Sequence, residues 1–353
     1  MSEDDLAAVQ GDFPGYRIWR EIFPGRDRYI VRSLVPGLHP HTLVTDDLGE
    51  LRGLLEPVRP PQPEAFTTAR ANVARMYAHW LGGKDSFEAD RSAADSVLVK
   101  FPEIAEVARA NRAFLARAVR HVAQQGVRQF IDFGAGLPAS PNVHEIAREH
   151  VPDARVVYLD HDPVVLSHAR ALLATDEHIA VVAGDVRNPA EAMTDPALAQ
   201  LISNTEPICV ILGSVLHFLA ADKADAAVAW FRDWMAPRSY LVISAGTSTG
   251  TDPELVRQLQ AAFGDAAPVT GRSAGEIAAW FDGLAVARPG VVDVWAWRPD
   301  SLRRPVQSRA RILAGVGRKT AAGTGGSVER DEWDVLAVGG RPELARRVRA
   351  RPR

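Results

Sequence analysis

Residues 130–147, "FIDFGAGLPASPNVHEIA", decide the fold of this chain. An apolar run that includes Asp132 leads into Gly134 and Gly136, and a helical pattern follows them. Because glycine has no Cβ, a ligand can approach the backbone of such a turn closely. Together with Ala139, the two glycines match the G-x-G-x-x-A pattern of dinucleotide-binding turns, which is a weak signal when it stands alone. The stretch predicts a strand, a ligand-binding turn and a helix, and it leaves the ligand open.

Short apolar runs alternate with helical patterns from residue 127 onward. Near-continuous apolar runs are typical of parallel strands that are covered on both faces. Five such runs follow one another: "RQFIDFG", "RVVYLD", "IAVVAGD", "PICVILGSV" and "SYLVISAG". The helical patterns "SPNVHEIAREH" and "DPVVLSHARALLA" separate the first three, which gives a βαβαβ unit and a doubly wound α/β sheet. After residue 290, "VVDVWAW" and "SRARILAGVG" predict two closing strands, with a helix in "SAGEIAAWFDG" before them.

We divide the chain into four segments on its composition. Residues 1–58 form a small α+β module and residues 64–126 a helical segment, and the proline-rich stretch "PVRPPQP" between them predicts a stiff linker. Residues 127–319 hold the sheet, and residues 320–353 form a basic extension. From Arg341 this extension has six arginines and one glutamate, which favours a solvated tail over a binding site for an anionic partner.

Local patterns predict the elements of the first two segments. In the module, "YRIWREIF" and "RYIVRSLV" predict strands, and "TDDLGELRGLLE" predicts a helix with Thr45 as its N-cap. In the helical segment, residues 101–126 predict one long helix with Pro102 in its first turn and Gly126 as its C-cap. Asn111 falls on the apolar stripe of that helix, where it is either a satisfied inward amide or a ligand contact.

The overall composition excludes several classes of protein. A net charge of −3 gives the chain no general attraction to nucleic acid or to an anionic membrane. Its single cysteine, Cys209, excludes an intramolecular disulfide and a cysteine-based zinc site. No apolar run reaches the length that spans a bilayer, and the first residues are acidic where a signal peptide is basic. We expect a cytoplasmic protein with a small-molecule substrate, and the sequence leaves a homodimer open.

The loop after the glycine turn bears on the ligand. In a dinucleotide fold the turn opens directly into a helix whose N-terminus faces the pyrophosphate. Here residues 137–139 intervene, and Ser140 and Pro141 predict an N-cap and a first-turn proline. The longer loop favours a ligand without a diphosphate, and the chain has no G-x-x-x-x-G-K-[ST] phosphate-binding motif.

Acids at the ends of the next two predicted strands narrow the choice of ligand further. Asp160 ends the second strand, where a carboxylate can accept hydrogen bonds from a ribose diol, although an NAD site uses the same acid. Asp185 ends the third strand, where an acceptor can bond an adenine amino group. Because the carboxyl ends of parallel strands meet at one edge of a sheet, these acids and the glycines converge on one crevice. This combination favours S-adenosylmethionine over NAD.

From Asn72 to Lys319, about 70% of its length, the chain resembles the actinobacterial S-adenosyl methyltransferase family. The resemblance implies a seven-stranded Rossmann-like methyltransferase sheet with a helical N-terminal cap formed around residues 75–90. It also implies that Gly134, Gly136 and the two strand-end acids bind S-adenosylmethionine, and that the chain transfers its methyl group to a small-molecule acceptor such as a specialised metabolite. The matching stretches are "NVARMYAHWLGGKDSFEADR", "FPEIAEVARANRAFLARAVR", "QFIDFGAGLPASPNVHEIA", "VVYLDHDPVVLSHARALL", "GDVRNP", "VLHF", "WRPD" and "GVGRK".

Further residues are candidates for the cofactor site and the substrate site. Lys84 and Asp85 are predicted to contact the amino-acid end of the cofactor, and Asp132 either to brace the loop or to hold the methionine amine. Ala78, His79, Trp80 and Ser86 depart from the family's usual motif, so His79 and Trp80 are the candidate substrate residues. The remaining cofactor candidates are Asn111, His161, Val186, Gly213 and Ser214.

His217 and Tyr77 are the candidate catalytic residues. His217 follows the fourth strand, and an imidazole can act as a general base near neutral pH, although this side chain could equally only line the cofactor pocket. Tyr77 could stack on a ligand. The histidines form no H-E-x-x-H motif and there is no clear acidic cluster, so no metal is predicted.

Three other functions stay open at this stage. The first keeps the cofactor but catalyses a non-methylating reaction, such as a cyclisation or an elimination. The second is a non-catalytic binding or regulatory protein with the same fold. The third, an NAD(P) enzyme, is disfavoured by the loop before the helix.

Overall fold

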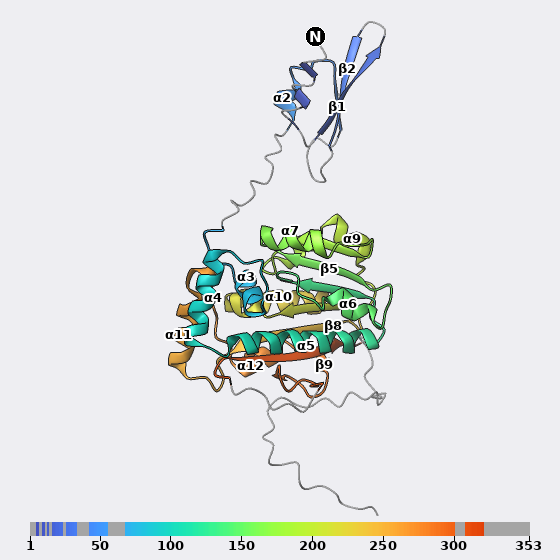
Figure 1. Cartoon of the computed structure of the whole chain (residues 1–353). Helices are drawn as coiled ribbons and strands as arrows, with labels where there is room; N and C mark the ends of the chain where they lie inside the picture. Colours follow the sequence, from blue (N-terminus) through green and yellow to red (C-terminus); the bar gives the residue numbers. More distant parts are fainter. Residues whose placement is uncertain are drawn as a thin grey trace, which may run out of the picture. The chain divides into compact units, whose positions relative to one another are not determined.

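The computed structural model describes residues 5–6, 9–10, 13, 16–23, 26–33, 42–55, 68–300 and 308–320. The chain forms two compact units, Met1–Phe66 and Thr67–Arg353, and Figure 1 includes both. The predicted linker at 57–63 and the arginine-rich tail lie outside the described residues.

The described part of the smaller unit contains a three-stranded antiparallel sheet and the short helix α2. Strands β1 (Tyr16–Phe23) and β2 (Arg26–Ser33) lie where strands were predicted and pair antiparallel, and β3 (Thr42–Thr45) pairs with β2. The predicted helix start was wrong, because α2 covers only Leu51–Leu54. The hydroxyl of Thr45 accepts a hydrogen bond from the N–H of Asp47 and so stabilises the turn after β3 instead of a helix. The four-residue β3 itself gave no signal long enough to predict a strand.

The larger unit is built on one twisted sheet with the order β6-β5-β4-β7-β8-β11, and both β9 and β10 pair with the free edge of β11. Strand β11 is antiparallel and the five before it are parallel, so the sheet has the seven positions that were predicted. The strands are β4 (Gln129–Phe133), β5 (Arg155–Asp160), β6 (Ile179–Ala183), β7 (Ile208–Gly213), β8 (Tyr240–Thr247), β9 (Leu284–Val286), β10 (Val292–Asp293) and β11 (Arg311–Lys319).

The edge position of the sheet differs from the prediction. The stretch "VVDVWAW" contributes only the two residues of β10, and β9, which was not predicted, takes the rest of the edge. The apolar residues after β10 serve the core instead, since Val294 and Trp297 are fully buried without being part of a strand.

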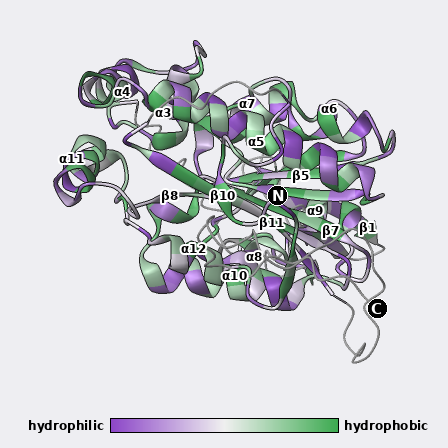
Figure 2. Cartoon of the chain, turned by 90° about the horizontal axis from the view of Figure 1, so that it is seen from below, coloured by the Kyte–Doolittle hydropathy of each residue, from purple (hydrophilic) through white to green (hydrophobic). Residues whose placement is uncertain are grey.

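Helices cover both faces of the sheet, as Figure 2 shows from below. Successive strand residues point to opposite faces, so Phe130 packs in one hydrophobic core and Ile131 in the other. The first face carries α5 (Ile104–Gln124), α6 (Val143–Arg148) and α7 (Pro163–Leu172). The second face carries α8 (Pro189–Ala192), α9 (Pro196–Leu201), α10 (Ala221–Trp234) and α12 (Ala274–Ala279).

Two predicted helix ends can be checked against these bounds. Helix α5 ends as predicted, with Gly126 at a φ of +81° just after its C-cap. Helix α6 begins later than predicted, with Asn142 as its N-cap. Ser140 lies two residues before this N-cap, and its hydroxyl donates to Glu145, the same carboxylate that accepts the N–H of Asn142 in a capping box.

A third hydrophobic cluster packs beyond the carboxyl ends of the parallel strands. It joins α3 (Val73–Trp80), α4 (Glu88–Lys100) and the start of α5 with α11 (Pro253–Phe263) and the 3₁₀ turns η1 (Leu216–Phe218) and η2 (Gly264–Ala266). Figures 1 and 2 both show α11 beside α4. These elements form a cap over the strand ends. No helix in the described part of the chain is long and apolar enough to cross a membrane.

Candidate active site

The turn after β4 requires glycine for two physical reasons. Gly134 and Gly136 have φ values of +71° and +67°, a region that other residues adopt only with strain. A Cβ on Gly134 would also overlap Cγ1 of Val215. The N–H groups of Gly134 and Ala135 both donate to the carbonyl oxygen of Leu159, at 2.8 and 3.0 Å, so the turn is fixed against β5.

Asp160 holds this turn and faces the same space. Its carboxylate accepts hydrogen bonds from the N–H groups of Gly136 (2.9 Å), His161 (2.8 Å) and Asp162 (3.0 Å). Burial raises its pKa above the usual range, and the two backbone bonds from Asp162 and Gly136 oppose that rise. A carboxylate has about four acceptor sites. Asp160 therefore has room for about one ribose hydroxyl in addition to its role in the turn.

The other two strand-end acids, Asp185 and Asp132, differ in their hydrogen bonding and in the direction of their pKa shifts. Asp185 is bound by the guanidinium and the backbone N–H of Arg187, whose hydrogen bonds outweigh burial and lower its pKa. Asp132 is only 7% exposed, and none of the described residues hydrogen-bonds its carboxylate. Burial raises the pKa of Asp132 to about 6, although Arg112 opposes the shift. Asp132 is thus the acid that is available to a cationic ligand group.

A cavity of about 690 Å³ lies between the strand ends and the cap, within the size range of small-molecule sites. Most of the predicted site residues line it. They are Tyr77, Trp80, Asn111, Asp132, Gly134, Gly136, Asp160, His161, Asp185, Val186, Gly213, Ser214 and His217.

His79, Lys84 and Asp85 are not brought to the cavity. His79 lies on another face of α3 and its Nε2 is 3.2 Å from Asp95 on α4. Helical periodicity explains the difference, since Tyr77 and Trp80 are three residues apart and share a face that His79 does not. Helix α3 ends at Trp80, and the exposed Lys84 and Asp85 follow the turn beyond it. The structure therefore gives no support for these three residues as ligand contacts.

Tyr77 and Asn111 form a hydrogen-bonded pair in the cavity wall. The Tyr77 hydroxyl donates to the carbonyl of Ala108 at 2.9 Å and accepts from Nδ2 of Asn111 at 3.0 Å. Burial raises the pKa of Tyr77, so this hydroxyl is a poor candidate for proton transfer. The other amide atom, Oδ1 of Asn111, is buried without a hydrogen-bond partner among the described residues. A buried acceptor of this kind is normally paired, so Asn111 is suited to a ligand donor.

The geometry of His217 disfavours a role as general base. Its Nδ1 accepts a hydrogen bond from the N–H of Gly246 at 3.3 Å, which leaves the ring proton on Nε2. Burial and the charge of Arg272 lower its pKa to about 4, so the ring is neutral at physiological pH. In this state His217 offers the cavity a hydrogen-bond donor.

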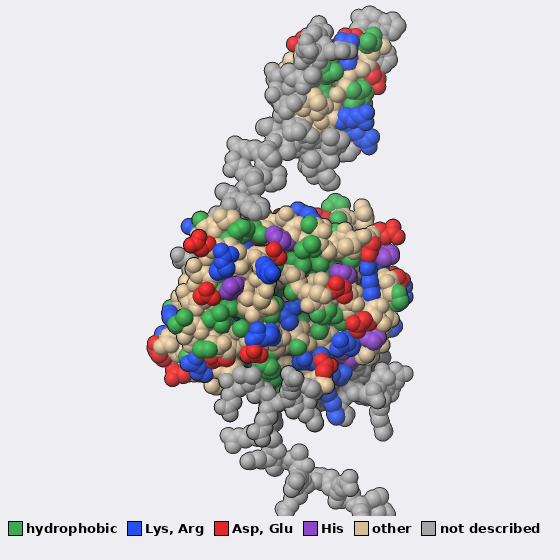
Figure 3. All heavy atoms as spheres, viewed as in Figure 1, with side chains coloured by type: hydrophobic (Ala, Val, Ile, Leu, Met, Phe, Trp, Pro, Cys, Tyr) green, Lys and Arg blue, Asp and Glu red, His purple; other side chains and the backbone are tan. Residues whose placement is uncertain are grey.

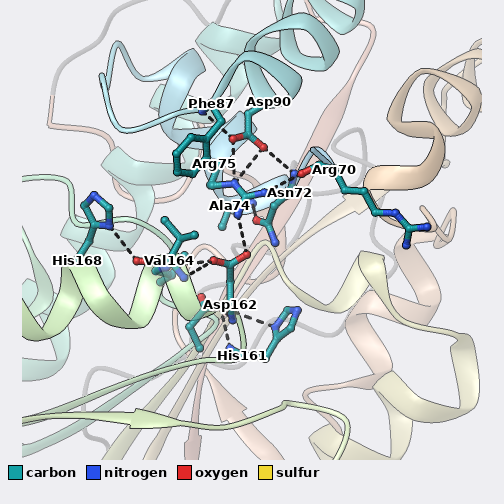
Figure 4. Close-up of polar contacts among 12 residues, drawn as sticks. Arg70, Asn72, Ala74, Arg75, Phe87, Asp90, His161, Asp162, Val164 and His168 are labelled. Atoms are coloured by element: carbon teal, nitrogen blue, oxygen red, sulfur yellow. Dashed lines mark hydrogen bonds and ion pairs between the residues drawn. The ribbon is translucent and has the colours of Figure 1, made fainter. Parts of the chain in front are cut away.

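Two arginines that the sequence reasoning missed position the site. Arg75 on α3 donates through Nε to both oxygens of Asp90, at 3.0 and 2.9 Å, and through Nη1 to Asp162 at 3.2 Å (Figure 4). Asp162 also caps α7, so this buried network ties the cap to the loop that follows Asp160. Arg112 on α5 donates to the carbonyls at the end of the glycine loop. Neither residue stood out, because an arginine in a helical pattern is usually a solvated one.

The sheet order and the strand-end acids define the class I methyltransferase fold, and the comparisons with known proteins identify the family. The sequence pattern of the S-adenosyl methyltransferase family matches residues 60–320, and the chain belongs to this family. It is 38% identical to a Thermobifida fusca protein provisionally described as a methyltransferase, over 75% of this chain and 100% of that one, with a TM-score of 0.69. A DUF574 family protein from Streptomyces avermitilis is 34% identical over 72% and 99% of the two chains, with a TM-score of 0.67. No curated protein matches.

The chain is thus an S-adenosylmethionine-dependent methyltransferase, and its cavity fits that cofactor. The glycine turn lets the ligand approach the backbone, and Asp160 keeps an acceptor position for a ribose hydroxyl. The buried carboxylate of Asp132 can bind the cationic amine of the methionine part. These groups lie at the switch point of the sheet, between β4 and β7, where open α/β sheets bind their ligands.

Proposed function

We propose that this methyltransferase acts on a small, largely apolar acceptor with an aromatic ring, which binds in the half of the cavity away from the strand-end acids. The observation that carries the proposal is the chemical division of the cavity. Its cap side is aromatic, with the ring centroid of Phe263 5.9 Å from that of Trp80 and 5.6 Å from that of Phe218. Perpendicular and tilted rings of this kind offer both faces and edges to a further aromatic ring.

The polar groups on the cap side are suited to orientation more than to proton transfer. His217 presents its Nε2–H and Asn111 an unpaired carbonyl oxygen, so the pair can hold an acceptor hydroxyl as both acceptor and donor. When bound, S-adenosylmethionine supplies a methyl carbon to the acceptor's lone pair while the C–S electron pair returns to sulfur. Such a displacement gains mainly from alignment. The acceptor's own proton passes to water.

Binding of the cofactor is the first experiment. Calorimetric titration of the wild type with S-adenosylmethionine, its demethylated product and NADH should show binding of the first two only. Asp132→Asn should weaken S-adenosylmethionine by about 10- to 100-fold, because it removes a charge-assisted hydrogen bond. Asp282→Asn, which changes an exposed aspartate outside the cavity, is the matched control. Binding of NADH, or no binding of S-adenosylmethionine, would refute the assignment.

Turnover then separates methylation from the alternatives. Incubation with methyl-labelled S-adenosylmethionine and a panel of phenols and naphthols should give labelled product and demethylated cofactor in equal amounts. Conversion of an acceptor without demethylated cofactor would identify a non-methylating enzyme. Cofactor binding without conversion of any acceptor would favour a regulatory protein.

We further propose a cytoplasmic location and a role in specialised metabolism. A reducing compartment suits a chain whose single cysteine, Cys209, is fully buried and unpaired. On the face of the larger unit in Figure 3, acidic and basic side chains are interspersed, which supports a small-molecule acceptor over nucleic acid.

A further inference from the structure

A second cavity, of about 90 Å³, adjoins the first on the other side of His217. Five residues line both cavities, so the two spaces adjoin each other along these side chains. They are Ile104, Val107, His217, Phe263 and Ile312. Beyond these five residues the second cavity is lined by apolar side chains of α11, by the end of α4, by the end of β8 and by the loop before α12. The principal apolar ones are Phe101, Leu255, Val256, Leu259 and Val269.

We propose that the second cavity receives an apolar tail of about three carbons on the acceptor, whose aromatic ring lies in the first cavity beside His217. This inference rests on the proposed function and deepens it, since it names the shape of the substrate. The acceptor is then an aromatic compound with a short, uncharged substituent.

Gly246 is the observation that points to an occupant. It lies inside strand β8 and lines the second cavity, and glycine weakens a strand interior. Its φ is not in the left-handed region, and a Cβ there would lie 3.7 Å from Cγ of His217, which is ordinary contact. Gly315 and Gly317 on the neighbouring strand differ, because a Cβ on either would press on Phe281 at 3.0 or 2.9 Å. Packing within the protein thus explains those two glycines but not Gly246, whereas a ligand beside the imidazole explains it.

The charges around the second cavity favour a neutral tail. Arg309 and Arg311 contribute to its lining, but Arg309 pairs with Glu103 at 3.0 Å and Arg311 with Asp293 at 3.3 Å. Both guanidinium groups are therefore compensated by carboxylates. The hydroxyl of Thr251 is buried without a partner among the described residues and also lines the cavity. This hydroxyl can pair with one hydrogen-bonding atom at the end of the tail.

The volume sets the length of the tail. A methyl or methylene group needs about 30 Å³, the volume that a water molecule takes in the liquid, so 90 Å³ holds about three carbons. Burial of each methylene should tighten binding by about fourfold.

A series of 4-alkylphenols tests the proposal by calorimetry on protein saturated with demethylated cofactor. From phenol through 4-methylphenol to 4-propylphenol, affinity should rise about fourfold per carbon, and 4-hexylphenol should gain nothing more. Gly246→Ala keeps the N–H to His217 but adds a methyl group to the cavity. It should weaken 4-propylphenol about fourfold and leave phenol and cofactor binding unchanged. Gly271→Ala, which lines the second cavity next to Val256, should act in the same way.

The matched control is Gly275→Ala on α12, which lines neither cavity and should change no affinity. If cofactor binds but affinity does not depend on tail length, or no phenol binds, the inference is overturned and the methyltransferase assignment stands. The inference is also overturned if Gly246→Ala behaves like Gly275→Ala. If S-adenosylmethionine itself does not bind, both fail.

Discussion

Replacing Gly134 with alanine separates the two reasons why the cofactor turn needs glycine. At a φ of +71° an alanine is strained by about 1–2 kcal/mol. Its Cβ would also overlap Cγ1 of Val215, and overpacking of this kind costs about 1–3 kcal/mol. Gly134→Ala should therefore lower the free energy of unfolding by about 2–5 kcal/mol. Gly126 isolates the first effect, because its φ is +81° and a Cβ there would meet no atom within 4 Å. Gly126→Ala should cost only about 1–2 kcal/mol.

A double-mutant cycle with Val215→Ala measures the second effect. That substitution removes Cγ1, so the double variant should recover about 1–3 kcal/mol relative to the sum of the single changes. Urea unfolding gives the free energies of unfolding. Titration with S-adenosylmethionine should show weaker binding to Gly134→Ala than to the wild type, and unchanged binding to Gly126→Ala. Equal costs for the two alanines, or no coupling with Val215, would refute the reasoning.

Three further predictions follow from the buried charges. Asp132→Asn should raise the free energy of unfolding at pH 7 by about 3 kcal/mol, because burial raises the pKa of Asp132 in the folded state to about 6 from the ordinary 3.8. This gain in stability should shrink as the pH falls through 6 toward 4. A gain that urea unfolding shows to be independent of pH would contradict the prediction. Arg75→Met should destabilise by about 3–5 kcal/mol, since it removes the cation that pairs with the buried carboxylates of Asp90 and Asp162. Adding Asp90→Asn should recover part of that loss in the same assay, and no recovery would argue against the network. By ¹⁵N NMR, His217 should carry its proton on Nε2 and titrate with a pKa below 5. A titration midpoint of the imidazole above pH 6 would restore His217 as a candidate base.

The strand ends were predictable from the sequence because one physical pattern fixes both the fold and the site. A parallel strand buried on both faces must be apolar along its length, so the first polar residue marks its carboxyl end. Asp160 and Asp185 were found in this way, and both line the cavity. The same logic could not tell which acid is free, since Arg187 pairs with Asp185 through a loop conformation that the sequence does not reveal.

The cap was less predictable because helical phase decides which residues face the ligand. Tyr77 and Trp80 face the cavity, whereas His79, between them in sequence, faces α4. Trp80 itself is anchored by a hydrogen bond from its indole to the carbonyl of Ala94, so it forms the wall more than it reaches for a substrate. The resemblance to the family placed Lys84 near the cofactor, but Lys84 follows the end of α3 and is not among the residues that line the cavity.

Glycines carry different information depending on what surrounds them. Gly134 is demanded by its φ and by Val215, and a Cβ on Gly213 would press on Leu115, so both positions follow from the fold. Neither reason applies to Gly246, which lies against His217, a residue that lines both cavities. Because glycine weakens a strand, a glycine that the protein's own packing does not require indicates space kept for something else. On this argument Gly134 indicates the cofactor site, and Gly246 indicates the space that we propose for the tail of the acceptor.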